Sequence, residues 1–430
     1  MLDRTLAPPA QPLVSVTLPA AELIALPGGA RLYVLHNAAQ PVVRLQAIFR
    51  AGKLAESKPG LALLTARMLL EGTPTRSARQ IADEVAFFGA SVECEAGLDR
   101  ATLTLYCLTR HLPTLLPLVL DVLTVPAFPA PEMAQLQTRT VQNVQVERQK
   151  TAYLAGDAFN ALLFGAETPY GRSFDTEGFA QLTAADARAF HAAAYGLGSA
   201  EIFLSGDVAN VQAAVAAAFA TATNTQSISE NSASVEQPEA HVAPDAAVVR
   251  VPLAGSLQAS LRMGRPWPGL AHPDTHRLNL LAKVLGGYFG SRLMRNIRED
   301  KGLTYGIYAS VAPRERGTTL VIGTDVKGDQ ADFAIAEITS ELRRLQEELI
   351  PEEELLTVKS YVLGKFANEL STVFEQVDKY KTLVMLGLPA DYYTTFTQQI
   401  GAATAAELRE LARQYLVPEQ MQVVVAGPAA

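Results

Sequence analysis

Apolar positions recur along this chain with two periods, which predict a mixture of short strands and amphipathic helices. Every second residue from Val43 to Phe49 is apolar, as on a half-buried strand. Ser77 followed by Gln80 three residues later is a capping-box pattern and predicts the start of a helix. Strands and helices grouped in this way, with hairpins, favour an α+β layered fold over a doubly wound one.

A helix is also predicted in the second half, after Asp329, which is placed to cap it. Its apolar stripe is Ile338, Leu342, Leu345 and Leu349.

The chain repeats itself at long range. Four short patterns recur in order at an offset of about 220 residues, among them Pro131-Glu132, which returns as Pro351-Glu352. The segment 221–247 is rich in Ser, Thr, Asn, Ala and Pro and predicts an exposed linker. We therefore expect two homologous halves, 1–220 and 248–430, joined by the linker 221–247.

The tract from 285 to 308 combines several of these signals. A helical pattern ends at Gly286-Gly287, a second helix follows, and Gly302 supplies the left-handed stop that a helix C-terminus favours. Arg298 is then expected in the last helical turn, and Tyr305 at the start of a strand. A guanidinium and a phenol placed in this way could converge on one carbonyl oxygen, although the spacing alone fits an ordinary helix-strand junction better.

The order of residues in this tract resembles the C-terminal-half signature of pitrilysin/insulysin-type inverzincin peptidases, including the mitochondrial processing peptidase. The resemblance implies that Arg298 and Tyr305 bind substrate opposite a zinc ion. It also implies a clamshell of two layered halves, each an antiparallel sheet with helices. Gly286, Gly287 and Gly290 stand where the non-catalytic subunit of the processing peptidase has a longer glycine-rich substrate-handling loop. A simple helix terminator explains these glycines at least as well.

The same resemblance points to Gly60–Thr73, where the family's zinc helix reads Gly-Leu-Ala-His-x-x-Glu-His-Met. In this chain Leu63 replaces the first His, Ala66 the catalytic Glu, and Arg67 the second His. The third ligand, a Glu in the family, aligns near Asn143. A zinc site needs N, S or O donors, which leucine lacks, and an arginine is a cation that repels the metal. We expect no zinc site in this chain, and zinc in a partner subunit.

Composition excludes some alternatives. A net charge of −8, with 36 Lys and Arg against 44 Asp and Glu, offers no basic stripe for nucleic acid. Cys94 and Cys107 are predicted in one hairpin but not opposite each other, so no disulfide is implied. No signal peptide and no membrane span are evident. The expected location is the cytoplasm, or the periplasm if a presequence has been removed.

Three functions follow from these observations. The first is a pseudo-peptidase subunit, inactive alone, which pairs with a zinc-bearing homologue as a heterodimer or a dimer of heterodimers and binds unfolded peptides. The second is a structural scaffold like the core subunits of the respiratory cytochrome complex. The third, a hydrolase that uses His272 and His276, is the least favoured, because no third ligand stands at a familiar distance and Pro273 suits a first helical turn.

Overall fold

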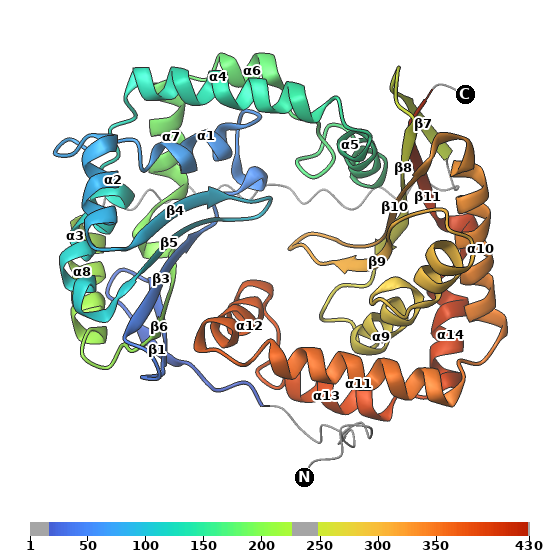
Figure 1. Cartoon of the computed structure of the whole chain (residues 1–430). Coiled ribbons are helices and arrows are strands. Elements are labelled where there is room, and N and C mark those ends of the chain that lie inside the picture. The colour runs from blue at the N-terminus through green and yellow to red at the C-terminus, as the bar shows by residue number, and fades with distance from the viewer. Residues whose placement is uncertain (1–16, 226–247, 429–430) are drawn as a thin grey trace, which may run out of the picture.

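The structure, a computed structural model, describes residues 17–225 and 248–428. It is built around two β-sheets that stand on opposite sides of the molecule and face each other, each with helices on its outer side (Figure 1). The predicted α+β fold of two halves is confirmed.

The first half forms a six-stranded sheet in the order β1-β2-β6-β3-β5-β4. Its elements are β1 (Glu22–Ala25), β2 (Arg31–His36), β3 (Val42–Phe49), α1 (Leu61–Met68), α2 (Ala78–Phe87), β4 (Ser91–Ala96), β5 (Ala101–Leu108), α3 (Leu112–Thr124), α4 (Ala130–Glu147), α5 (Thr151–Phe164), α6 (Thr176–Ala180), α7 (Ala184–Ala194), β6 (Glu201–Gly206) and α8 (Gln212–Thr225). The helix α8 therefore extends to Thr225, past the point where the linker was expected to begin, and 226–247 lie outside the described residues.

The second half forms a five-stranded sheet in the order β7-β11-β8-β10-β9. Its elements are β7 (Val248–Pro252), β8 (Gln258–Trp267), α9 (Thr275–Gly286), the π-helix η4 (Met294–Asp300), β9 (Ile307–Ala312), β10 (Thr318–Lys327), α10 (Ala331–Glu347), α11 (Glu352–Asn368), α12 (Val373–Leu386), α13 (Tyr392–Ala402), α14 (Ala405–Tyr415) and β11 (Gln422–Gly427).

The two sheets share one topology. If β2, β6, β3, β5 and β4 are matched with β7, β11, β8, β10 and β9, the strand orders are identical. Each sheet also contains one parallel pair, β2 with β6 and β7 with β11, among otherwise antiparallel pairs. The shared order, including the position of the parallel pair, supports the predicted duplication.

One helix of each half packs on the sheet of the other half. The α5 helix of the first half packs on β8 and β11 of the second sheet, and α12 of the second half packs on β6 and β2 of the first. The apolar contacts under α12 include Tyr33 and Phe203, whose rings stack at 4.8 Å, and Val373 and Val377. Each sheet is thus covered on part of its inner face by the opposite half.

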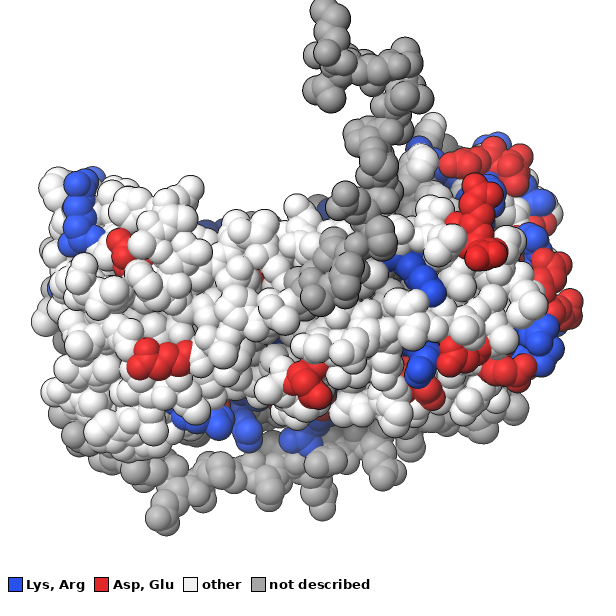
Figure 2. All heavy atoms as spheres, turned by 90° about the horizontal axis from the view of Figure 1, so that it is seen from below, with Lys and Arg blue, Asp and Glu red and all other residues white. Residues whose placement is uncertain are grey.

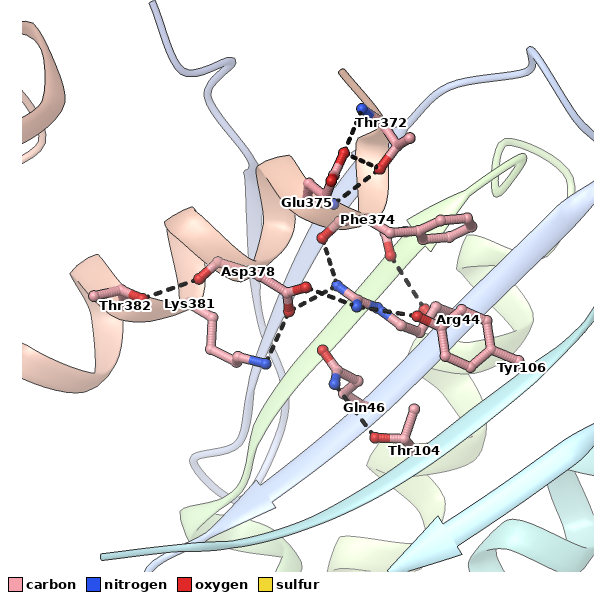
Figure 3. A network of polar contacts seen from close by, with 11 residues as sticks. Arg44, Gln46, Thr104, Tyr106, Thr372, Phe374, Glu375, Asp378, Lys381 and Thr382 are labelled. Carbon is pink, nitrogen blue, oxygen red and sulfur yellow. Dashed lines mark hydrogen bonds and ion pairs between the residues drawn. The ribbon is translucent and has the colours of Figure 1, made fainter. Parts of the chain in front are cut away.

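Arg44 anchors α12 to the first sheet (Figure 3). It lies on β3, is 5% exposed, and donates to both carboxylate oxygens of Asp378 at 3.0 Å. It also donates to the Phe374 carbonyl at 2.7 Å and to the Tyr106 hydroxyl at 3.1 Å. Because charge-assisted hydrogen bonds are stronger than neutral ones, this network stabilises the contact between the halves.

A second contact between the halves joins two hairpin turns. Arg100, at the β4–β5 turn, forms an ion pair with Glu315, at the β9–β10 turn. The backbone N–H of Glu315 also donates to Asp99, at 3.2 Å. The Asp99 carboxylate accepts a further hydrogen bond from Tyr170, so the turns are held together by polar contacts.

Local predictions can be compared with the observed elements. Ser77 and Gln80 form the predicted capping box, and Cys94 pairs with Leu103 rather than with Cys107. The predicted cap at Asp329 is wrong, because α10 begins after Gln330 and Asp329 lies in the preceding 3₁₀ turn. Leu349 is 51% exposed because α10 ends at Glu347, before the predicted stripe is complete.

Charged side chains are unevenly spread on the face that Figure 2 shows. Both signs alternate over the C-terminal half, and most of the N-terminal half is uncharged on this face. Within the described ranges, no helix is both long enough and apolar enough to cross a membrane.

Candidate functional site

The Gly286-Gly287 pair lets the end of α9 approach β9 closely. A Cβ atom on Gly286 would lie 2.6 Å from the backbone nitrogen of Ala309, closer than real Cβ contacts. A Cβ atom on Gly287 would lie 2.7 Å from the Cα of Lys283, in the preceding helical turn. Packing therefore accounts for both glycines, and their proposed role in handling substrate stays a prediction, as does that of Gly290.

The segment that carries Arg298 is fixed by contacts with α10 and α11. Ile297 is fully buried, and Arg292 donates two hydrogen bonds to Glu354 at 3.0 and 3.1 Å. Asn296 donates to Glu341 of α10 at 2.9 Å. These contacts fix the segment to α10 and α11.

This segment is a π-helix rather than the predicted α-helix. The N–H of Lys301 donates to the carbonyl of Asn296, five residues back, at 3.1 Å. The predicted left-handed stop is confirmed at Gly302, with φ +63°, and the N–H of Leu303 donates to the Ile297 carbonyl across it at 3.0 Å. Short π-helical turns are frequent at functional sites, because they change where side chains point.

Arg298 is partly exposed and stacks on an aromatic ring. Its guanidinium carbon lies 4.7 Å from the centre of the Phe289 ring, and Phe289 is itself exposed. No carboxylate of residues 17–225 or 248–428 forms an ion pair with Arg298. The guanidinium is thus oriented by a ring and keeps its hydrogen-bond donors for another group.

Tyr305 combines a fixed backbone with a free side chain. It lies in a bend two residues before β9, not in the strand itself, and is 94% exposed. The neighbouring Thr304 hydroxyl lies 2.7 Å from the Asp325 carbonyl, accepts from the N–H of Gly306 at 3.1 Å, and lies 3.0 Å from the Thr324 hydroxyl. These bonds hold the bend on β10, so the phenol extends into solvent from a rigid base.

Arg298 and Tyr305 flank a single turn, but the structure shows no hydrogen bond between their side chains within the described part of the chain. Whether they share a target stays a prediction. Sequence reasoning missed Phe289, although its position between Gly287 and Gly290 places it beside the tract.

The helix at the position of the family's zinc motif is α1, which packs against β4, α7 and α4. Leu63 is half-buried, Ala66 is fully buried, and Arg67 and Asn143 are exposed. These four side chains do not fit a zinc ion, because two are aliphatic and one is a cation. No group of three or more metal-binding side chains occurs in the described ranges either.

The start of α1 is nevertheless well supported. Glu56 accepts from the N–H of Ala62 at 3.1 Å and from Arg172 at 2.8 Å. Burial raises the pKa of Glu56, and these hydrogen bonds and the nearby cations oppose that rise. The backbone at this position is therefore held by interactions that need no metal.

The two histidines considered as metal ligands lie in different environments. His276 is 3% exposed and packs against the rings of Tyr392 and Phe396 at 4.6 and 5.4 Å. Burial, helped by the charge of Arg277, lowers the pKa of His276 to about 4. His272 is partly exposed and accepts from the N–H of Asp274. This arrangement supports a structural role for both.

Two family models match the chain. A model described as insulinase (peptidase family M16) matches residues 31–165, and one described as the peptidase M16 inactive domain matches 181–362. Among curated proteins, the "Non-peptidase homolog YmxG" of Helicobacter pylori is 22% identical over 88% of each chain. The "Uncharacterized zinc protease YmxG" of Bacillus subtilis is 28% identical over 40% of this chain and 42% of its own.

Solved structures agree with the family models. The structure of a peptidase M16 inactive domain from Pseudomonas fluorescens has a TM-score of 0.85 and 26% identity, and the match covers 95% of this chain and 98% of that one. The structure of a protease from Helicobacter pylori has a TM-score of 0.87 at 18% identity, covering 96% and 100%, and supports the fold alone.

Proposed function

Because the chain belongs to the peptidase M16 family, we propose that it is a non-catalytic, substrate-binding subunit of a heteromeric zinc peptidase. In this proposal a homologous chain with an intact His-x-x-Glu-His helix supplies the zinc site. This chain supplies Arg298 and Tyr305 to the same composite site. The name of the Helicobacter pylori relative, a non-peptidase homologue, supports the view that such chains need not be peptidases themselves.

One observation carries the proposal, which is the exposure of Tyr305 on a rigid turn. An exposed side chain contributes little to folding stability, so its own packing does not explain a 94% exposed phenol. The hydrogen bonds of Thr304 reduce the freedom of the turn before any ligand arrives. The held backbone fixes where the Tyr305 side chain starts, so a bound substrate has only the phenol left to orient as a donor to a developing negative charge.

The roles of the two side chains follow from their chemistry. Tyr305 donates a hydrogen bond to the oxygen of the peptide carbonyl that is attacked, where negative charge develops. Arg298 donates to a neighbouring backbone carbonyl that does not react. Its stacking on Phe289 directs the guanidinium and limits its motion.

The expected substrates are unfolded peptides. The two sheets face each other, and α5, α12 and the joined hairpin turns connect the halves. An extended chain fits between such halves more easily than a folded domain. The assembly would contain one or two copies of each subunit.

The test is steady-state kinetics on a quenched-fluorescence peptide, with this chain mixed with a zinc-bearing homologue. Tyr305→Phe removes one hydroxyl and should lower kcat by about 10²–10³, as for other single donors to a developing oxyanion. Arg298→Ala should mainly raise KM, because it removes binding that is equal in the ground and transition states. The zinc content of the partner should stay unchanged in both mixtures.

Tyr308→Phe is the matched control, because it removes the same hydroxyl from an exposed tyrosine on the adjacent strand β9. It should leave kcat and KM near their wild-type values. If Tyr305→Phe and Arg298→Ala both retain the full kcat/KM, the chain is a scaffold and the composite site is rejected.

A further inference from the structure

A cavity of about 240 Å³ lies within the second half, between α9, α11, α12 and α13. It is separate from Arg298 and Tyr305, neither of which lines it. Its volume is below the roughly 300–1,000 Å³ that is typical for drug-sized ligands. A ligand of this cavity is therefore a small molecule or a single terminal residue.

The cavity is lined by more positive than negative charge. Lys283, Lys365 and Lys379 contribute ammonium groups, and Glu369 contributes the carboxylate. Glu369 is already shared, because it lies 2.5 Å from Lys379 and 3.7 Å from Lys365. The lining thus carries an excess of two positive charges.

Lys283 is the lysine without its own counter-ion. No carboxylate in the described part of the chain forms an ion pair with it, and it is half-buried. Burial lowers its pKa, the positive charge of Lys365 lowers it further, and the negative charge of Glu369 only partly opposes both. A bound anion would relieve both effects, since it offers an opposite charge in the place of lost water.

Gly287 makes room for this lysine. A Cβ atom on Gly287 would lie 2.3 Å from the Cδ of Lys283, so any larger residue there would displace the stem of the lysine. Gly287 therefore also constrains the path of the Lys283 side chain to the cavity.

The remaining walls are largely aromatic. Tyr361 and Phe366 come from α11, and Tyr392, Tyr393 and Phe396 come from α13. Rings of this kind bind the apolar part of a ligand. In small-ligand sites a few polar side chains usually bind its polar group and fix its orientation. Here the polar recognition falls to lysines, which bind anions.

We infer that this cavity binds a carboxylate carried on a small apolar or aromatic body, with the carboxylate at Lys283 and Lys365 and the body against the rings. Two sources share this chemistry: the C-terminal residue of a peptide and a free aromatic acid. The inference does not depend on the composite active site, because the lone chain contains the whole cavity.

The experiment is calorimetric titration of the lone chain with N-acetylphenylalanine and, in parallel, N-acetylphenylalanine amide. The two probes differ in charge but hardly in shape. The acid should bind about tenfold or more tightly than the amide, because a charge-assisted hydrogen bond is stronger than a neutral one. Two further titrations, one with a short peptide that ends in Phe and one with 3-phenylpropionate, then distinguish a peptide C-terminus from a free aromatic acid.

Variants locate the site. Lys283→Met keeps the length of the side chain and should weaken binding of the acid about tenfold, which removes the preference over the amide. Lys365→Met should weaken it in the same direction. Lys327→Met is the control, since this exposed lysine at the end of β10 does not line the cavity.

Thermal melting checks that each variant is folded. Equal binding of acid and amide, or full affinity in a folded Lys283→Met variant, would overturn the inference. Peptidase activity is not measured, so failure here leaves the proposed function standing. Conversely, loss of the composite site in the kinetic test leaves this cavity unaffected.

Discussion

Asp378→Asn tests whether one charged contact holds the two halves together. Asp378 lies on α12 and accepts two hydrogen bonds from Arg44, which is buried on β3 of the opposite half. The substitution keeps the size of the side chain but removes its charge. Arg44 is then a buried cation without a counter-charge at this contact: the amide oxygen can still accept one hydrogen bond, beside the Phe374 carbonyl and the Tyr106 hydroxyl, but the second, charged acceptor is lost.

The expected cost can be worked from burial. Removing one partner of a fully buried ion pair costs about 3–5 kcal/mol, because it leaves an unpaired charge. The Asp378 side chain is 43% exposed, so water screens part of the pair, and we expect a loss of about 2 kcal/mol. The loss should fall mainly on the contact of α12 with the first sheet.

The pH dependence has a definite sign. Burial raises the pKa of Asp378, but the hydrogen bond from Arg44 and the charges of Lys381 and Arg44 together lower it below its usual value. A depressed carboxyl pKa contributes stability that is complete above the ordinary aspartate pKa of about 3.9 and is lost as the pH falls through the folded-state value. The difference between wild type and Asp378→Asn should therefore be full at neutral pH and vanish only in acid.

The assay is native-state hydrogen exchange of the α12 amides together with urea unfolding. Glu410→Gln is the matched control, because it removes one carboxylate from an exposed ion pair with Arg413 within α14. Such exposed pairs contribute about 0.2–1 kcal/mol or less. The reasoning fails if Asp378→Asn lowers the free energy of exchange of the α12 amides by no more than Glu410→Gln lowers the free energy of unfolding. Such a result would mean that Arg44 does not depend on its ion pair with Asp378.

Three further predictions concern the metal and a buried histidine. The purified chain alone should hold no stoichiometric zinc and cleave no peptide, and elemental analysis that finds about one tightly held zinc per chain would contradict this. Changing Leu63→His, Ala66→Glu, Arg67→His and Asn143→Glu together should restore some zinc binding, and a well-folded quadruple variant without it would show that the alignment of the lost site is wrong. Burial lowers the pKa of His276 to about 4, so its imidazole stays neutral in the folded protein. The free energy of unfolding should therefore fall by up to about 3 kcal/mol as the pH drops from about 6.5 to 4. In His276→Phe the urea midpoint should depend less on pH over that range.

The sequence predicted the elements of the fold better than the contacts between them. Alternation from Val43 to Phe49 predicted one buried face, yet Arg44 and Gln46 on the other face are also buried. The helix that covers them, α12, begins more than 300 residues later, and no local pattern records where it will pack. The ion pair of Arg44 with Asp378 was unpredictable for the same reason.

The candidate site shows the same division. The order of residues pointed to Arg298 and Tyr305, and the turn between them formed as predicted at Gly302. The π-helical backbone was missed, because a helical pattern in the sequence reports which side chains are buried and not which carbonyl each N–H selects. The exposure of Tyr305 was also missed, because the strand pattern was extended two residues too far.

The two regions that the family resemblance singles out, α1 in the first half and the turn between Arg298 and Tyr305 in the second, are held in different ways. In the first half Ala66 is fully buried and Glu56 accepts a hydrogen bond from the first turn of α1, so the helix at the position of the family's zinc motif packs as a structural element. In the second half Arg298 and Tyr305 keep free donors on a turn that its neighbours hold in place. Exposed donors alone do not distinguish the two regions, because Arg67 in the first is exposed as well. What distinguishes the second is that the bend carrying Tyr305 is held on β10 by the hydrogen bonds of Thr304, and that Arg298 stacks on Phe289. Donors on a backbone that is already ordered are the physical reason to expect a substrate there.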